Sequence, residues 1–130
     1  LLPILIITVL KMIWGRQRFR SMTDPSNQFT PWYLMQTFTS DNEFMSFPSG
    51  HSANSATVIW ITLLPLWIEK LKPYRRLLVV AAYGWIVCVM LSRIIMGAHF
   101  STDVLIGSSI TLGLFYYLQS VYLRDELISL

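Results

Sequence analysis

Four apolar stretches alternate with polar segments along the 130 residues of this chain. The first, at 1–14, is too short to span a bilayer unaided, and we expect it to be the end of a helix that begins upstream. The other three, at about 52–68, 77–95 and 103–123, are each long enough to cross a bilayer as a helix. The pattern predicts an all-α, multi-pass membrane helical bundle, with one domain at 1–130 whose first helices are missing from this chain.

Composition supports a membrane protein, because 54% of the residues are hydrophobic and only 13% are charged. A soluble domain of this size normally needs more charge on its surface. The basic residues behind the net charge of +3 lie in clusters between apolar stretches, which is typical of membrane loops and not of a nucleic-acid-binding face. Cys88 is the only cysteine, so a disulfide framework and a cysteine metal site are both excluded.

A long polar and aromatic loop is expected at 15–50, between the first two apolar stretches. Pro25 and Pro31 interrupt it, and we expect the segment 31–38 to form a short interfacial helix. Loops of this length inside a compact domain are often lids or substrate-entry elements.

The connectivity brings three polar segments to one face of the membrane. Because successive spans alternate in direction, His51 and His99 are expected on the same side. The first helix leaves the membrane at Lys11–Arg20, which must also be that side. The basic turn Lys70–Arg76 and the tail at Arg124 lie on the opposite side.

The segment from Ser92 to Asp103 places an Arg, a His and an Asp at the end of an apolar run, where charges are costly unless they have a function. If Ser101 or Thr102 caps the next helix, Asp103 lies in its first turn, within reach of a carboxylate–imidazole hydrogen bond to His99. Such a bond fixes the tautomer and makes the other ring nitrogen a better nucleophile or base.

The same face carries groups suited to a phosphate. Its cations and helix start could bind an anion, a glycine would let a ligand approach the backbone, and a second imidazole could protonate a leaving oxygen. These groups are Lys11, Arg18, Arg93, Ser49, Gly50 and His51. With a nucleophile and its orienting carboxylate, they describe phosphoryl transfer without a metal ion.

Each group also has a simpler interpretation. Arg16 and Arg20 are best explained as charges that set membrane topology. Pro-Ser-Gly-His is a short motif that could be only a turn before a helix. His51 could be an interfacial histidine bonded to the loop. Asp103 could be only a favourable charge at a helix N-terminus.

Three motifs in this order and spacing resemble the type 2 phosphatidic acid phosphatase superfamily, which also includes vanadium haloperoxidases and glucose-6-phosphatase. The family signature is Lys-x6-Arg-Pro, then Pro-Ser-Gly-His, then Ser-Arg-x5-His-x3-Asp. The matching residues are Lys11 and Arg18, then Pro48, Ser49, Gly50 and His51, then Ser92, Arg93, His99 and Asp103. Phe19 stands where the family has Pro, which leaves the turn after Arg18 open.

The resemblance implies a bundle that usually has six membrane helices, of which this chain would lack the first two and part of the third. It implies that His99 attacks phosphorus to form a phosphohistidine, that Asp103 supports it, and that His51 protonates the leaving group. It implies that the phosphate is held by Lys11, Arg18, Ser49, Gly50 and Arg93. The hydrolytic members require no metal, and we expect no cofactor.

The sequence thus favours a membrane phosphatase for a lipid phosphate or diphosphate, such as phosphatidate, phosphatidylglycerophosphate or undecaprenyl diphosphate. A phosphotransferase with the same pocket and a non-catalytic membrane scaffold are the alternatives. Expected partners are the lipid substrate and membrane lipids, without nucleic acid, and the oligomeric state stays open. Basic residues not assigned to the site are more numerous at Lys70–Arg76 and Arg124, so the positive-inside rule predicts an active site on the extracytoplasmic face of the cell membrane.

Overall fold

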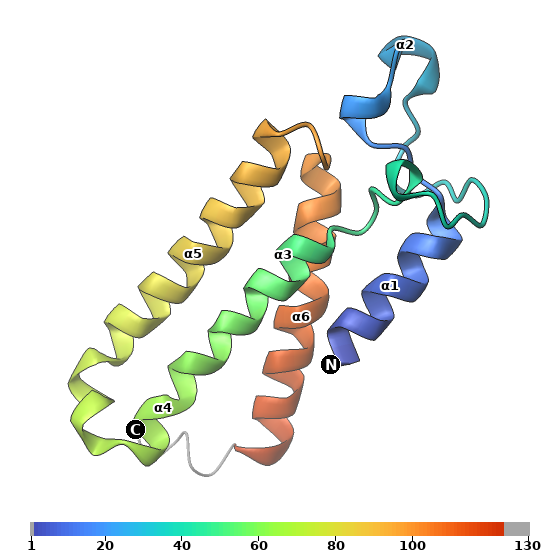
Figure 1. Cartoon of the computed structure of the whole chain (residues 1–130). Helices are drawn as coiled ribbons and strands as arrows, with labels where there is room; N and C mark the ends of the chain where they lie inside the picture. Colours follow the sequence, from blue (N-terminus) through green and yellow to red (C-terminus); the bar gives the residue numbers. More distant parts are fainter. Residues whose placement is uncertain (1, 124–130) are drawn as a thin grey trace.

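The computed structural model describes residues 2–123, and over these residues the chain is helical and contains no strand. Within residues 2–123, four helical columns form the bundle, arranged as in Figure 1. They are α1 at Leu2–Trp14, the run of α3 at Gly50–Ser55, η3 at Ala56–Leu63 and α4 at Leu64–Trp67, then α5 at Arg75–Ile95 and α6 at Ser101–Tyr122. The all-α prediction is confirmed, and the observed bounds lie within two residues of the predicted ones.

The second column differs from the single helix predicted at 52–68, because its middle is a 3₁₀ helix. It nevertheless runs as one continuous column beside α5 (Figure 1). A 3₁₀ helix rises about 2.0 Å per residue against 1.5 Å for an α-helix, so the column reaches roughly 31 Å, close to the thickness of the hydrocarbon core. Pro65 lies in the first turn of α4, where its missing N–H costs no hydrogen bond.

Two helical segments are long and apolar enough to cross a membrane by length and composition, namely Glu69–Ile95 and Ser101–Tyr122. The first includes the short helix η4 at Glu69–Tyr74, which leads directly into α5. Large apolar side chains such as Val80 and Ile95 are exposed on α5, at 68% and 84%. A soluble monomer rarely exposes so much contiguous apolar surface, whereas a helix that faces lipid or further helices does.

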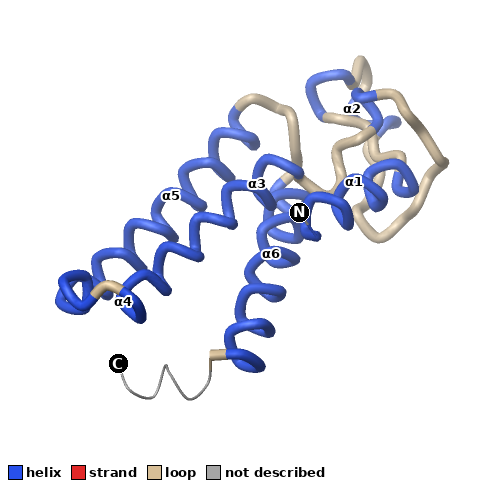
Figure 2. Tube along the Cα trace, turned by 60° about the horizontal axis from the view of Figure 1, so that its bottom comes forward, coloured by secondary structure: helices blue, strands red, loops and turns tan. Residues whose placement is uncertain are grey.

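The core lies between the second column, α5 and α6. Ile59 and Leu63 of η3 pack there against Ala82 and Phe115. α1 packs against α3 and α6, while α5 lies on the other side of α3 (Figure 2). The column that begins at Gly50 therefore lies in the middle of the bundle. Its contacts with the helices on both sides fix where its first residues lie.

The loop at 15–49 covers one end of the bundle and contains three short helices. They are η1 at Phe19–Ser21, α2 at Pro25–Gln28 and η2 at Asn42–Phe44. The helix expected at 31–38 is wrong, because the chain at 36–39 instead donates backbone hydrogen bonds to the end of α1, from Gln36 N–H to Trp14 O and from Thr39 N–H to Met12 O. The last carbonyls of α1 lack partners within the helix, and the segment supplies them.

The two ends of the bundle carry different groups, as the alternation of helices predicted. The end of α1, the start of α3 and the α5–α6 connection lie at one end, and the turn at Lys70–Arg76 lies at the other (Figure 1). The tail predicted at Arg124 lies outside the described residues.

Candidate active site

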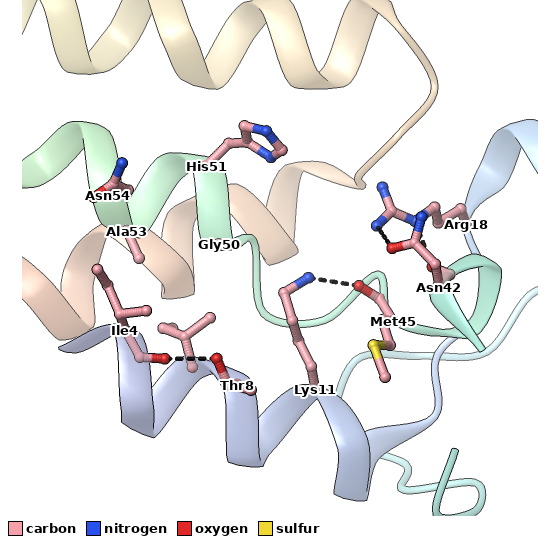
Figure 3. Close-up of a pocket in the computed structure, with 11 residues that line it drawn as sticks. Ile4, Thr8, Lys11, Arg18, Asn42, Met45, Gly50, His51, Ala53 and Asn54 are labelled. Atoms are coloured by element: carbon pink, nitrogen blue, oxygen red, sulfur yellow. Dashed lines mark hydrogen bonds between the residues drawn. The ribbon is translucent and has the colours of Figure 1, made fainter. Parts of the chain in front are cut away.

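A cavity of about 420 Å³ lies where α1, the 15–49 loop and the start of α3 meet (Figure 3). Its polar lining comes from Lys11, Arg18, Asn42, Gly50 and His51, and its apolar lining includes Ile4, Ile7, Met45 and Ala53. The cavity thus brings together four of the eight residues predicted for the site. The other four, Ser49, Arg93, His99 and Asp103, do not line it.

Lys11 and Arg18 are held by neutral oxygen atoms. Lys11 Nζ donates to Met45 O at 2.6 Å, and Arg18 donates to Asn42 O at 2.8 Å and to Asn42 Oδ1 at 2.9 Å (Figure 3). Within residues 2–123, neither cation has a carboxylate within 4 Å, whereas Arg20 pairs with Glu43 at 2.9 Å. Two cations that line one cavity without a carboxylate in direct contact attract an anion.

The start of α3 forms another wall of the cavity. Ser49 caps this helix and accepts a hydrogen bond from Ser52 N–H at 3.3 Å. Ser49 is fully buried and does not line the cavity, whereas the adjacent Gly50 does. A Cβ atom at Gly50 would lie 3.4 Å from Lys11 Cε, so the glycine keeps room between helix start and cation.

His51 is exposed and points into the space above Gly50 and Lys11 (Figure 3). The positive charges of Arg93, Lys11 and Arg18 all act on it. Arg93 is half-buried in the last turn of α5 and donates from Nε to Ser92 Oγ at 3.2 Å. Arg93 therefore contributes its charge from outside the cavity lining.

Asp103 is completely buried as the third residue of α6. Its Oδ2 accepts from Ser46 Oγ at 2.5 Å and from Phe100 N–H at 2.9 Å, while its Oδ1 pairs with the Arg16 guanidinium. Phe100 is the N-cap residue, so the prediction that Ser101 or Thr102 caps this helix is wrong. The side chain of Asp103, the third residue of α6, accepts the hydrogen bond from the N–H group of the N-cap residue, as the third residue does in a capping box.

His99 does not bond directly to Asp103. Its Nδ1 lies 2.7 Å from Ser46 O and 3.9 Å from Asp103 Oδ2, and the longer separation exceeds a hydrogen bond. The predicted carboxylate–imidazole bond is therefore replaced by a bond to a backbone carbonyl. Because a carbonyl only accepts, Nδ1 carries the proton and Nε2 keeps a free lone pair, with no hydrogen bond to any residue in 2–123.

The environment of His99 keeps its imidazole neutral. The ring is buried, and burial together with the positive charges of Lys11 and Arg18 lowers the pKa of His99 to about 3. A neutral ring with an unprotonated Nε2 is the form that can act as a nucleophile.

Comparison with known proteins identifies a family for this chain. The sequence pattern described as "PAP2 superfamily" matches residues 1–125. The chain belongs to the PAP2 superfamily. It is also similar to the phosphatidylglycerophosphatase B of Bacillus subtilis (strain 168), with 38% identity over 76 residues, which are 57% of this chain and 37% of that protein. The chain thus spans well under half the length of that relative, and no solved structure matches it.

Arg16 is the residue of this PAP2 superfamily member that sequence reasoning assigned wrongly. It is 2% exposed, donates from Nε to Thr30 O at 2.9 Å and from Nη1 to Thr102 Oγ1 at 3.0 Å, and pairs with Asp103. A buried carboxylate needs a cation, which signals that some partner for Asp103 exists. The sequence offers several candidates between Lys11 and Arg20 and no means to choose among them.

Ser46, Asn42 and Met45 were also missed. Ser46 and Met45 contribute backbone carbonyls to His99 and Lys11, and Asn42 binds Arg18 through a carbonyl and its side chain. Backbone acceptors leave no residue-type signal in a sequence, so only the folded loop reveals them.

Proposed function

We propose that this chain is part of an integral membrane phosphatase that hydrolyses a lipid phosphate or diphosphate through a phosphohistidine intermediate. One observation carries the proposal: Lys11 and Arg18, which line the cavity without a carboxylate of residues 2–123 in direct contact, also act with their charges on the neutral His99, whose Nε2 is free. The superfamily and the name of the relative support the same reaction class.

In the proposed first step, Lys11 and Arg18 bind the phosphoryl oxygens and Arg93 adds its charge. His99 Nε2 donates its electron pair to phosphorus as the bond to the leaving oxygen breaks, and that oxygen keeps the bonding pair. His51 gives a proton to it. The imidazolium formed at His99 is stabilised by Asp103, 3.9 Å away.

In the second step, water attacks phosphorus, His51 takes the proton of that water, and the bond between phosphorus and His99 breaks. Phosphate then leaves and both histidines return to their starting states. Gly50 is proposed to let the phosphate approach the backbone, and Ser49 to hold that backbone by capping α3.

A lipid substrate is supported by the two sides of the cavity. Ile4 of α1 and Ala53 of α3 lie on the side away from Arg18 (Figure 3), and Ile7 adds to the apolar lining. A phosphoester bound at the cations would place its alcohol portion against these side chains. Phosphatidylglycerophosphate, phosphatidate and undecaprenyl diphosphate all fit this description.

Phosphate release by the purified full-length protein from these three lipids tests the proposal. Turnover should persist in EDTA, because the proposed steps use only side chains, and vanadate should inhibit by occupying the anion site. Labelled substrate quenched during turnover should leave phosphate on His99. Transfer to an added alcohol without release would favour a phosphotransferase, and absence of turnover on all three lipids, or its dependence on added magnesium, would refute the proposal.

We also propose that the site faces away from the cytoplasm, since the turn at Lys70–Arg76 lies at the opposite end of the bundle. Single cysteines at Ser40 and Lys70 in a Cys88→Ala background test this in intact cells. An impermeant thiol reagent should label position 40 and spare position 70. The reverse pattern would place the site in the cytoplasm.

A further inference from the structure

Ser46 joins the carboxylate to the imidazole, although it belongs to none of the three motifs. Its hydroxyl donates to Asp103 Oδ2 at 2.5 Å, and its carbonyl accepts from His99 Nδ1–H at 2.7 Å. Ser46 is 0% exposed, so water does not compete for either contact. Within residues 2–123, Ser46 therefore links Asp103 to His99 by hydrogen bonds, whereas the direct separation of 3.9 Å is too long for one.

Arg16, at the start of the same loop, completes the arrangement. Its backbone carbonyl accepts from Ser46 N–H at 2.9 Å, and its guanidinium pairs with the other oxygen of Asp103. The guanidinium also lies 4.2 Å from the centroid of the Phe100 ring. Arg16 and Ser46 are thus bonded to each other and hold one carboxylate oxygen each.

We infer that Arg16 and Ser46 are positioning residues, which fix Asp103 and, through the Ser46 carbonyl, set the orientation of the His99 imidazole. The inference rests on the proposed function, because it assigns a catalytic consequence to this arrangement. Neither residue is proposed to touch the substrate.

The arrangement also controls charge. His99 lies near Asp103, Arg16, Lys11, Arg18 and His51. With Arg16 bound, the negative charge of Asp103 is compensated and does not draw a proton onto the imidazole before the reaction. With the Ser46 hydroxyl bound, Oδ2 of Asp103 already accepts two hydrogen bonds and does not bind Nδ1 of His99 directly. Loss of either contact should leave the carboxylate freer to stabilise imidazolium in the resting state.

A purely structural role predicts something different. An ion pair that only fastens the loop to α6 would lower stability when broken, and would leave the protonation of His99 unchanged. The acidic limb of the pH profile of kcat/KM separates the two possibilities, since it reports the protonation of the free enzyme.

The experiment uses the full-length protein and lipid phosphate hydrolysis. Ser46→Ala and Arg16→Gln should lower kcat about 10- to 100-fold, in keeping with the loss of a hydrogen bond to a charged group, with little change in KM. Both should move the acidic limb of kcat/KM to higher pH. Ser108→Ala removes another buried hydroxyl, and Arg20→Gln another arginine of the same segment, and both should behave like the wild type.

The outcomes distinguish this inference from the proposed function. An inactive wild type would refute the function itself. An active wild type with normal kcat in Ser46→Ala and Arg16→Gln, or with reduced kcat and an unmoved acidic limb, would overturn the inference alone. If Arg16→Gln does not fold, Arg16→Lys is used in place of that variant, because it keeps the buried charge. If neither Ser46→Ala nor Arg16→Lys folds, the two residues serve folding, and the inference is overturned too.

Discussion

The surroundings of Asp103 and the cavity beside Lys11 differ in whether their charged groups have a partner of opposite charge. Asp103 is fully buried, pairs with Arg16, and accepts two further hydrogen bonds. Lys11 and Arg18, in contrast, border an open cavity and have only carbonyl and amide oxygens as partners. One region has every charge matched within the protein, and the other has positive charge left over.

The difference separates positioning from binding. A buried carboxylate with all its partners in place is costly to move and suits a fixed reference for a catalytic side chain. Cations without a carboxylate keep their attraction for an anion that arrives from outside. His99 lies between the two regions, held by Ser46 on one side and exposed to the charges of Lys11 and Arg18 on the other.

The largest effect on turnover is expected from a substitution of His99, which lies between the two regions. His99→Ala should lower kcat by at least about 1,000-fold, because no other group can form the covalent intermediate. Phosphate release from phosphatidylglycerophosphate measures it. Vanadate should still bind to the variant, since the cavity cations remain, and near-normal turnover would contradict the covalent mechanism.

A smaller effect should come from the cavity cations. Lys11→Gln and Arg18→Gln should each weaken vanadate binding about 10- to 100-fold, the effect expected for one charge-assisted hydrogen bond. Titration of inhibition gives the affinities. Arg20→Gln is the matched control, since Arg20 already pairs with Glu43 at the surface, and an equal loss in all three variants would show that only overall charge matters.

The contact that holds the start of α3 against α6 can be tested with a pair of glycines. A Cβ atom at Gly107 would overlap the Ser49 carbonyl, whereas one at Gly113 would meet nothing within 4 Å. Gly107→Ala should cost about 1–3 kcal/mol of unfolding free energy by overpacking, and should reduce turnover by moving Ser49. Gly113→Ala should be neutral or slightly stabilising, as measured by thermal unfolding in detergent. Equal melting temperatures would show that α3 and α6 are packed more loosely than this.

A further effect, confined to acidic pH, is a pH dependence of stability. The pKa of His99 is lowered to about 3 in the folded protein, from an ordinary value of 6.5, so the unfolded chain binds a proton that the folded chain refuses. Stability should therefore fall as pH drops from about 6.5 towards 3. The Tm of the wild type should decline more steeply over this interval than that of His99→Gln. Parallel curves would contradict a neutral buried imidazole.

The sequence by itself determined the helical columns and which residues share one end of the bundle. Apolar stretches long enough to span a bilayer predicted the bounds of α5 and α6 within two residues, because length and hydropathy are local properties. The alternation of helix direction then placed Lys11, His51 and His99 at one end without knowledge of packing. Motif spacing also separated Lys11 and Arg18, which lack carboxylate partners in residues 2–123, from Arg20, which has one.

Only the tertiary structure decided which groups bond to one another. Asp103 could have paired with any of several nearby cations, and burial within the folded loop selected Arg16. The Nδ1 partner of His99 is a backbone carbonyl of Ser46, 53 positions away, and every residue has such a carbonyl. The 31–38 segment looked helical from its composition but pairs with the end of α1, because the free carbonyls there supplied a competing partner that no local pattern records.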